Sequence, residues 1–357
     1  MFRLEKNYLI NSLQLEQYRG LNHVLIDDFS RVNIFVGANN CGKTSVLEAL
    51  KILSVPNSAG QLVEIALQRA RAGTAVKKSN LINYLTTIFQ KPQDGSESGS
   101  YHLNLGIQVQ GRSHQYDVTG TLGRIVDSAG RSEDIFNLIF RKTIDGEDFD
   151  YSDFQIINGQ EYTFSSDISP LYRALYVPAS VNYYRSCVKF LSKQIIRTGK
   201  KDVMQILKTF DENIDDISII GEDIYLHSTY ANSMALFAYG AGMQKAVFLA
   251  ACLMYCKDGV ILVDEIDNAI HISAFEAVFD WFLEACRNWN VQAFVTTHSA
   301  EAIDSIIKTA HDRYRDEDIL RVITLRKNYD TNKTVAKIRS GDDAYQDRTC
   351  FEMELRV

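Results

Sequence analysis

The 357-residue sequence predicts an α/β protein with a mainly parallel central sheet. Three short apolar runs have the character of buried strands: 31–37 (RVNIFVG), 260–265 (VILVDE) and 291–299 (VQAFVTTHS). The helices expected between and after these strands are 44–53, 243–256, 269–288 and 300–311. Strands that alternate with helices in this way form parallel sheets with covered faces, and ligands bind beyond the carboxyl ends of such strands.

The strand–helix alternation is interrupted by a long middle segment. Strand patterns at 10–18 and 22–26 precede the first core strand, and residues 56–100 hold two helix-like pieces. Strands and turns then prevail from Tyr101 to about Val177, and helix returns at 181–213. We therefore expect one domain made of 1–55 and 175–357, with 56–174 as an inserted α+β lobe.

Composition narrows the class of protein. Hydrophobic residues make up 46% and charged residues 23%, as in ordinary globular domains. The N-terminal residues lack the apolar core of a signal peptide, and no run approaches 18 apolar residues, so we expect no membrane span. Six cysteines without CxxC pairs favour a reducing compartment, so the expected location is cytoplasmic. The net charge of −7 argues against a surface that binds nucleic acid all over, but leaves a local basic patch open.

The segment GANNCGKT at 37–44 fits the phosphate-loop pattern GxxxxGK[ST] in full. Glycines let the backbone fold round phosphates, Lys43 offers a charge to the β- and γ-phosphates, and the Thr44 hydroxyl suits Mg²⁺. A chance Gly/Asn turn is the alternative, but a strand precedes the loop and a helix follows it. The predicted nucleotide-binding residues here are Gly37, Ala38, Asn39, Asn40, Cys41, Gly42, Lys43, Thr44 and Ser45.

Polar residues end the second and third apolar strands. Asp264 is predicted to hold Mg²⁺, directly or through water, and Glu265 to polarise the attacking water. His298 follows the third strand and is predicted to hydrogen-bond the γ-phosphate or that water. The structural alternatives are an acidic turn or helix cap for the two carboxylates and a packing role for the histidine. Because Lys43 falls at the same expected edge of the sheet, we predict a catalytic group of Lys43, Glu265 and His298.

A second glycine turn lies in AYGAGMQKAVFLAACLMY, which starts at Ala238. Gly240 and Gly242 open an apolar helix, and a Gly-rich turn at a helix start is a ready site for an anion. The chain already has a phosphate loop far upstream, so the motif alone leaves the use of a second turn unexplained.

These motifs together resemble the ABC-type ATPase heads of the SMC, RecF and OLD group, most closely the OLD-like ATPases. LQLEQYRGL resembles their first strand, and GANNCGKTSVLEAL their Walker A loop and first helix. YGAGMQKAVFLAACL, KDGVILVDEIDNAIH and VQAFVTTHS resemble their signature, Walker B with D-loop, and switch histidine, and FEMELRV resembles a terminal strand. The resemblance covers roughly 1–55 and 175–357. It implies an ABC-type P-loop NTPase head with N-terminal antiparallel strands and an inserted lobe.

The resemblance also implies how the second glycine turn is used. Heads of this group pack head to tail, so that the signature of one copy covers the γ-phosphate held by the other. The implied enzyme is therefore an ATPase that uses ATP and Mg²⁺ and forms a homodimer, with a higher oligomer left open. The nucleotide contacts implied outside the phosphate loop are Gly240, Gly242, Gln244 and Asn268.

The chain departs from the group's pattern in two places. Gly240 stands where a signature serine is usual, and no glutamine follows ALYV, where Pro178, Ala179 and Ser180 stand instead. Full OLD nucleases carry a TOPRIM domain after the head, but only 59 residues follow His298. Separate heads of this kind often act with a distinct effector, such as a TOPRIM-like nuclease or another toxin, in bacterial anti-phage systems. The implied role is thus a switch or sensor subunit.

Two other classes of function remain open. One is a RecF- or SMC-like DNA-repair ATPase, and the other is a nucleotide-gated scaffold with little turnover, against which Glu265 argues. A basic stripe bears on the first class, because its cations would share one helix face and track a phosphate backbone without reading sequence. A solvated helix face is the alternative. The stripe consists of Arg185, Lys189, Lys193 and Arg197.

Overall fold

The computed structural model describes residues 8–55, 59–71, 80–90, 100–126, 132–157, 169–179, 188, 192, 200–221, 223–229, 232–328, 331 and 333–356. The chain forms two compact units. Unit 1 comprises Met1–Phe29, Ala38–Tyr172 and Leu325–Lys337. Unit 2 comprises Ser30–Gly37, Arg173–Thr324 and Ile338–Val357.

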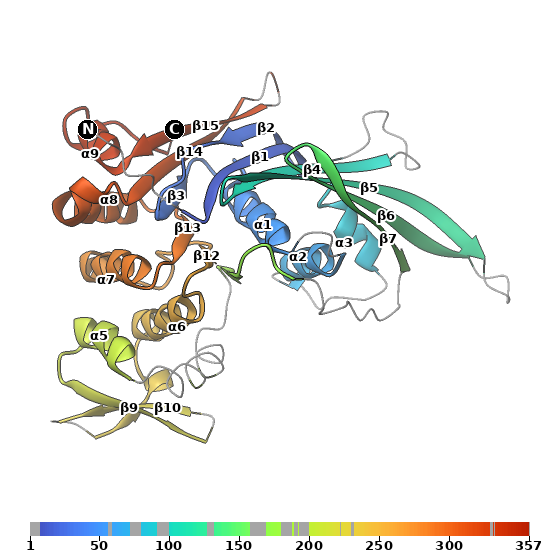
Figure 1. The fold of residues 1–357 in the computed structure, drawn as a ribbon. Helices are drawn as coiled ribbons and strands as arrows, with labels where there is room; N and C mark the ends of the chain where they lie inside the picture. The colour runs from blue at the N-terminus through green and yellow to red at the C-terminus, as the bar shows by residue number, and fades with distance from the viewer. Residues whose placement is uncertain are drawn as a thin grey trace. The chain divides into compact units, whose positions relative to one another are not determined.

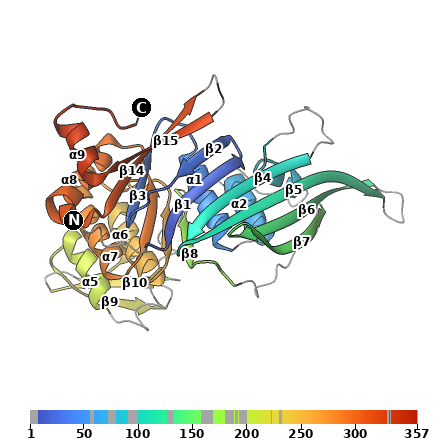
Figure 2. The same ribbon diagram turned by 45° about the horizontal axis from the view of Figure 1, so that its top comes forward.

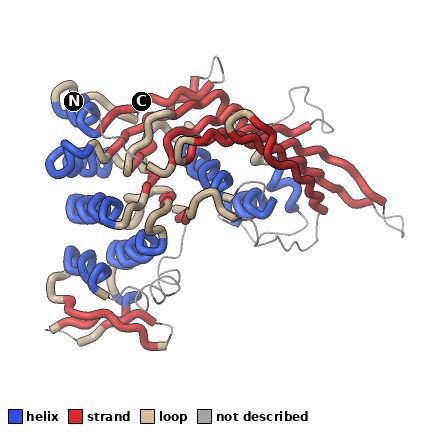
Figure 3. The backbone as a smooth tube through the Cα atoms, in the orientation of Figure 1, coloured by secondary structure: helices blue, strands red, loops and turns tan. Residues whose placement is uncertain are grey.

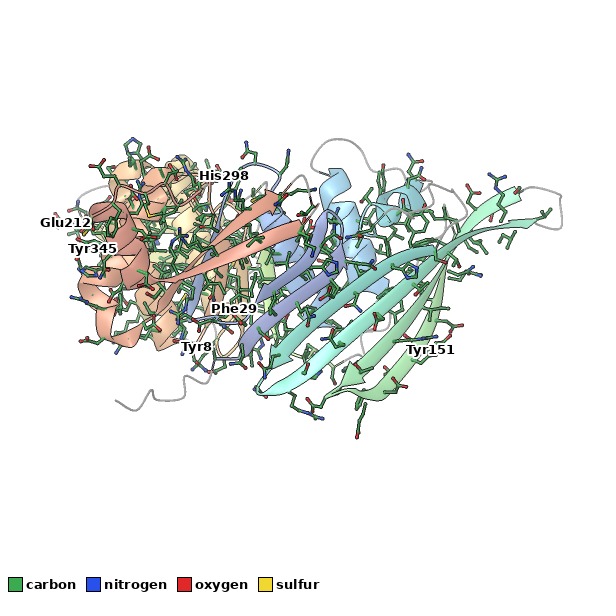
Figure 4. The ribbon with its side chains drawn as sticks, turned by 90° about the horizontal axis from the view of Figure 1, so that it is seen from above. Tyr8, Phe29, Tyr151, Glu212, His298 and Tyr345 are labelled. Carbon is green, nitrogen blue, oxygen red and sulfur yellow. The ribbon has the colours of Figure 1, made fainter. Side chains whose placement is uncertain are left out.

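Unit 1 is built on a six-stranded antiparallel sheet in the order β2-β1-β4-β5-β6-β7. Its strands are β1 (Ile10–Tyr18), β2 (Leu21–Ile26), β4 (Ser100–Val109), β5 (Arg112–Val126), β6 (Ser132–Ile144) and β7 (Glu147–Ile157). Leu13 of β1 lies opposite Ile107 of β4. The strands of the middle segment therefore extend the N-terminal sheet directly. Tyr151 lies on β7, the edge strand, and is exposed (Figure 4).

Three helices accompany this sheet. They are α1 (Lys43–Ser54), α2 (Ala59–Arg71) and α3 (Leu81–Thr86). They lie against one face of the sheet (Figures 1 and 2).

Arg19, in the turn between β1 and β2, contacts α1 through a buried ion pair of 3.1 Å between its Nε and Oε2 of Glu48. The Tyr18 hydroxyl donates to the same oxygen at 3.3 Å. The first helix is thus tied to the aromatic-Arg-Gly turn at residues 18–20.

Unit 2 contains most of a second six-stranded sheet, in the order β15-β14-β3-β13-β12-β8. Its strands are β3 (Val32–Val36), β8 (Ala174–Val177), β12 (Val260–Val263), β13 (Gln292–Thr296), β14 (Leu320–Asn328) and β15 (Lys333–Ser340). All pairings from β14 to β8 are parallel. Every residue of β3, β12 and β13 is buried, as expected of strands inside a parallel sheet. The predicted α/β fold class is confirmed.

Helices cover one face of this sheet, and Figures 1 and 3 show α5 to α8 stacked as a layer. The helices of unit 2 are α5 (Lys201–Phe210), α6 (Ala241–Tyr255), α7 (Phe275–Asn288), α8 (Ala300–Tyr314) and α9 (Gly341–Thr349). One apolar core joins them to the sheet, with Val263, Phe279 and Ile306 among its members. A small antiparallel sheet joins β9 (Ile214–Ile220), β10 (Asp223–Ser228) and β11 (Met234–Ala235).

The expectation of a terminal strand at FEMELRV is wrong. Residues 351–356 follow α9 as an irregular segment, while β14, β15 and α9 complete unit 2. Side chains supply hydrogen bonds that a neighbouring strand would otherwise provide: Thr324 Oγ1 donates to the carbonyl of Leu355 at 2.8 Å, and Arg348 Nη1 to that of Met353 at 2.9 Å. Leu355 is buried, so the segment is anchored without pairing.

Two further expectations fall outside the described residues. They are the strand pattern EYTFS at 161–165, within the strand-rich part of the middle segment, and the part from 181 to 199 of the helix expected at 181–213, of which only residues 188 and 192 are described. Among the helices that the structure describes, none is long and apolar enough to cross a bilayer.

Candidate nucleotide site

Three neighbouring strands of unit 2 bring their carboxyl ends to one edge of the sheet. Phe35 of β3 lies opposite Thr296 of β13, and Val295 lies opposite Val263 of β12. The chain therefore leaves β3 at Gly37, β12 at Asp264 and β13 at Thr297 along the same edge. This is the edge at which the sequence predicts nucleotide chemistry, and three of its predicted segments begin there.

A single hydroxyl organises the turn after β12. Thr296 Oγ1 donates to Oδ1 of the buried Asp264 at 2.6 Å, and it accepts the backbone N–H of Glu265 at 2.9 Å. The backbone N–H of Ile266 donates to the Thr296 carbonyl at 3.0 Å. Glu265 adopts a left-handed backbone with φ of 52°, which these contacts hold in place. Both carboxylates therefore belong to a turn whose backbone is fixed by Thr296.

Thr296 is not among the site residues predicted from the sequence. A hydroxyl residue that closes a buried strand, one strand away from a carboxylate pair, is the signal that points to it. The pairing of that hydroxyl with Asp264 depends on the strand register, which the sequence alone does not specify.

The phosphate-loop residues that belong to unit 1 form a tight turn. Asn40 and Gly42 have φ of 62° and 104°. A Cβ at Gly42 would lie 2.4 Å from Leu21 Cδ2, so both the backbone angle and the space require glycine. Helix α1 starts at the next residue with no side-chain cap on its first N–H groups, which leaves that end suited to an anion.

Lys43 is buried, and its Nζ donates to the carbonyl of Ala38 at 2.9 Å across the loop. The buried Cys41 sulfur lies 3.8 Å from the same ammonium. Thr44 and Ser45 follow in the first turn of α1. Three features of this loop fit a nucleoside triphosphate: a glycine cradle, a lysine folded over it and an uncapped helix start.

The residues predicted to hold Mg²⁺ carry oxygen atoms of the kinds that bind this ion. Asp264 offers carboxylate oxygens and Thr44 a hydroxyl, and Mg²⁺ in nucleotide sites is bound by one or two such groups together with phosphates and water. Among the described residues no group of three His, Cys, Asp or Glu side chains could hold a metal by itself. Thr44 belongs to unit 1 and Asp264 to unit 2, and their joint role remains a prediction.

His298 is exposed at the surface of unit 2, in the segment between β13 and α8 (Figure 4). Its carbonyl accepts a hydrogen bond of 3.1 Å from Arg356 Nη1. Arg356 is itself held by Glu354, at 2.7 Å between Nη2 and Oε2, and this pairing lowers the pKa of Glu354 to about 2. The irregular segment after α9 thus supports the backbone of the predicted switch histidine.

The signature glycines lie at the start of α6. Gly240 is the exposed N-cap residue, and no side chain caps the helix. A Cβ at Gly242 would lie 3.2 Å from the Ala269 carbonyl, so this residue marks a close approach between α6 and the loop after β12. The Gln244 amide donates to the Tyr239 carbonyl at 3.0 Å, within the turn itself. The roles of these residues toward nucleotide remain predictions.

Asn268 lies in the loop of residues 265–270, which we call the D-loop segment. Its side-chain amide donates to the Ala179 carbonyl at 3.2 Å, which joins the segment to the residues after β8. Ala179 is one of the residues that stand in place of a Q-loop glutamine, and Ser180 lies outside the described residues. Asn268 is thus placed in the structure by a contact that the sequence did not predict.

Lys245 is the second residue that the sequence analysis missed. It is fully buried in α6, and its Nζ donates to the carbonyls of Glu265 at 2.9 Å and Asn268 at 2.5 Å. Burial lowers its pKa to about 7, and the nearby carboxylates of Asp267 and Glu265 oppose that shift. A single lysine inside an otherwise apolar helix is the signal that would have drawn attention to it.

The basic stripe lies outside the described residues, at positions 185, 189, 193 and 197. The structure therefore does not test whether these cations share one helix face.

Two family profiles match separate parts of the chain. One, described as "AAA ATPase domain", matches residues 9–154. The other, described as "AAA domain, putative AbiEii toxin, Type IV TA system", matches residues 187–304. Both descriptions name AAA domains, and the two matches include the phosphate loop, the signature and the residues after β12 and β13.

Curated relatives point the same way at low identity. An ATP/GTP phosphatase of Helicobacter pylori is 23% identical over 334 residues, which span 85% of this chain and 89% of the relative. An uncharacterized protein of Methanocaldococcus jannaschii is 27% identical over 117 residues, or 33% of this chain and 98% of the relative. The DNA replication and repair protein RecF of Bifidobacterium adolescentis is 26% identical over 31% of this chain and 27% of its own length.

Solved structures show the same fold. An Smc head bound to the C-terminal winged-helix domain of ScpA has a TM-score of 0.52 and 14% identity, covering 93% of this chain and 98% of that one. An Smc head from Pyrococcus furiosus, bound to the C-terminal domain of ScpA, has a TM-score of 0.50 and 12% identity, covering 97% and 100%. Identities this low show the fold alone, which is an SMC head-like α/β fold. The match to the ATPase-domain profile and the similarity to the ATP/GTP phosphatase show that the chain is an ATP-hydrolysing enzyme.

Proposed function

We propose that this chain is an ATP-driven switch in which two copies enclose ATP between the phosphate loop of one and the signature glycines of the other. The observation that carries the proposal is the exposed, uncapped start of α6 at Gly240, in a unit that also presents Asp264 and Glu265. A second anion site beside a Walker-type sheet edge is explained if it serves a second molecule.

Each predicted residue has one task in this scheme. Lys43 and the glycine loop bind the β- and γ-phosphates, and Thr44 with Asp264 holds Mg²⁺. The bound Mg²⁺ neutralises charge that develops on the phosphate oxygens. Glu265 orients and polarises the attacking water, and His298 hydrogen-bonds the γ-phosphate or that water.

Dimer closure follows from differential binding. The N–H groups at Gly240 and Gly242 meet a γ-phosphate that ATP carries and ADP lacks, so only ATP favours the closed pair. Hydrolysis removes that contact and reopens the pair. The cycle releases ADP and phosphate and couples their release to a change of assembly.

Mixing two inactive variants tests the shared site. Gly240→Asp adds a negative charge where no atom lies within 4 Å of the new Cβ, so it opposes phosphate without a clash. Lys43→Ala disables the phosphate loop. Each variant alone is expected to be inactive, whereas their mixture is expected to regain up to about a quarter of wild-type turnover, because half the dimers are mixed and each has one complete site.

Gly240→Ala is the matched control for the added charge and is expected to stay close to wild type. Binding of a fluorescent ATP analogue should persist in Gly240→Asp, because its phosphate loop is intact. If the mixture stays inactive although both variants are folded and associate, ATP is not shared between copies.

We further propose that the switch controls a separate effector in anti-phage defence. The match to the AbiEii-type AAA profile supports that setting, and an effector such as a nuclease or another toxin would read the closed dimer. Affinity purification of a Glu265→Gln variant with ATP should enrich one partner relative to Lys43→Ala. Equal recovery with both variants would contradict nucleotide control of the partner.

DNA binding is the second candidate, and the partial similarity to RecF supports it. A backbone-tracking contact would weaken steeply with salt. Replacing Arg185, Lys189, Lys193 and Arg197 with alanine should then reduce affinity for duplex DNA and leave basal ATPase unchanged. Unchanged DNA affinity in that variant would exclude the stripe as the binding surface.

A further inference from the structure

Lys245 occupies a position that ordinary core packing does not explain. It is the single charged residue of α6, it lies three residues after Gly242, and its side chain is fully buried among the apolar residues of unit 2. Burying an ammonium group is costly unless carbonyls or charges compensate it. A leucine or methionine would fill the same space without that cost, so the charge calls for a specific contact.

That contact is with the backbone of the D-loop segment. Lys245 Nζ donates to the carbonyls of Glu265 and Asn268, at 2.9 and 2.5 Å. The same segment closes on itself through the Asn268 N–H, which donates to the Glu265 carbonyl at 3.0 Å. The ammonium therefore binds both ends of the turn formed by residues 265–268.

The D-loop segment needs such support because its backbone is strained. Glu265 and Ala269 have φ of 52° and 66°, in the left-handed region that non-glycine residues seldom adopt. Such a conformation is disfavoured and persists only where its surroundings hold it. Lys245 binds the carbonyl of Glu265 itself and the carbonyl of Asn268, the residue directly before Ala269.

Helix α6 also meets the segment at its first turn. The Ala269 carbonyl would lie only 3.2 Å from a Cβ at Gly242, so the signature turn and the D-loop segment are in close contact. Lys245 adds a hydrogen-bonded contact one turn further along the same helix. A shift of the signature turn toward or away from a phosphate is therefore transmitted to the loop that begins at Glu265.

We propose that Lys245 is a positioning residue that couples the signature turn to the catalytic glutamate through the backbone of the D-loop segment. In the dimer proposed above, on which this coupling rests, the signature of one copy and its Glu265 serve different ATP molecules. Lys245 then makes the rate of hydrolysis at one site respond to occupancy of the other. The coupling acts through hydrogen bonds from Lys245 to backbone carbonyls and involves no contact between Lys245 and nucleotide.

Substitution of Lys245 tests the proposal. Lys245→Met keeps a similar length and volume but cannot donate to the two carbonyls, so kcat is expected to fall at least tenfold with KM for ATP changed less than threefold. The Hill coefficient for ATP is expected to fall to about one. Lys245→Arg keeps the donors and is expected to recover part of kcat and of the cooperativity.

Val247→Ala is the matched control. This residue is fully buried in the same helix, and its truncation weakens the packing of α6 without removing a hydrogen-bond donor. Urea unfolding of all three variants gives the loss of unfolding free energy in each, so that losses of kcat can be compared at equal stability. If Val247→Ala and Lys245→Met lose kcat equally at equal stability, or if Lys245→Met keeps wild-type kcat and cooperativity, the proposal is overturned.

The outcome also separates this inference from the dimer scheme. If wild-type protein shows no cooperativity and no ATP-dependent dimer, the dimer scheme and the coupling between sites both fail. A loss of kcat in Lys245→Met with rescue by arginine would, in that case, still support positioning of Glu265 within one copy.

Discussion

Thr296 shows how much of the candidate site depends on one atom. Its hydroxyl donates to Asp264 and accepts from the N–H of Glu265, so it fixes a predicted metal ligand and a predicted base together. It has no charge and is not among the residues predicted to bind nucleotide or metal. Its importance comes from the strand pairing that places β13 beside β12.

Thr296→Val should therefore impair catalysis beyond its effect on stability. Valine has the same shape, but it leaves the buried Asp264 oxygen and the Glu265 N–H without this partner, which costs about 1–3 kcal/mol of unfolding free energy. We expect kcat for ATP to fall at least tenfold, because both carboxylates lose their fixed turn. Steady-state kinetics beside urea unfolding measure the two effects.

Thr296→Ser provides the control, because it keeps the hydroxyl and deletes one methyl. It should regain most of the activity despite a packing defect. Equal activity in the valine and serine variants would show that the hydroxyl does not position the carboxylates.

At the residue scale, the sequence predicted groups that carry their own chemistry. Lys43, Asp264 and Glu265 could be identified from motif spacing and from their position after apolar strands. Thr296 and Lys245 could not, because their roles lie in contacts with backbone and side chains that are distant along the chain. Hydroxyl and ammonium groups become informative only once the register and the helix packing are known.

Elements differ in how far their sequence determines them. The buried strands β3, β12 and β13 are continuous apolar runs whose environment is the same on both sides, so pattern alone located them. The segment at 351–356 has alternating character but pairs with no strand, and side-chain hydrogen bonds from Thr324 and Arg348 take the place of a ladder. Alternation predicts a half-buried chain and does not by itself predict a pairing partner.

Helix α6 gives a testable pH dependence. The folded protein holds Lys245 with a pKa of about 7, below the value of an unfolded lysine, because burial disfavours the ammonium. Between these two values the unfolded chain binds more protons, so the free energy of unfolding gains about 1 kcal/mol per pH unit from this residue. The gain begins as pH rises through about 7 and is absent at lower pH.

Lys245→Met should remove this contribution. The difference in unfolding free energy between wild type and variant, measured by urea denaturation from pH 6 to 9, should grow in favour of wild type above about pH 7. The carboxylates of Glu265 and Asp267, which face the ammonium, remain in both proteins. A difference that does not vary with pH would show that Lys245 titrates as an exposed lysine.

For the whole molecule, the central expectation concerns assembly. If ATP is turned over only between two copies, turnover per chain must fall when the protein is diluted below the concentration at which it dimerises. We expect specific ATPase activity to rise with protein concentration and then level off. Light scattering with ATP should show the dimer over the same range.

Glu265→Gln should shift that dimer to lower concentrations, because bound ATP is not consumed. Gly240→Asp should abolish it. Full specific activity from a chain kept far below its dimerisation range would exclude the shared site and leave an ATPase that works as one copy.

The contacts of Lys245 have a consequence for how its role could be found by mutation. Both acceptors are main-chain oxygens, which every amino acid supplies. An alanine scan across 265–270 would remove each side chain of that loop and still leave these two bonds intact. Only a change at position 245 removes the donor, so a survey confined to the residues predicted to bind nucleotide or metal would not reveal the coupling between the two nucleotide sites.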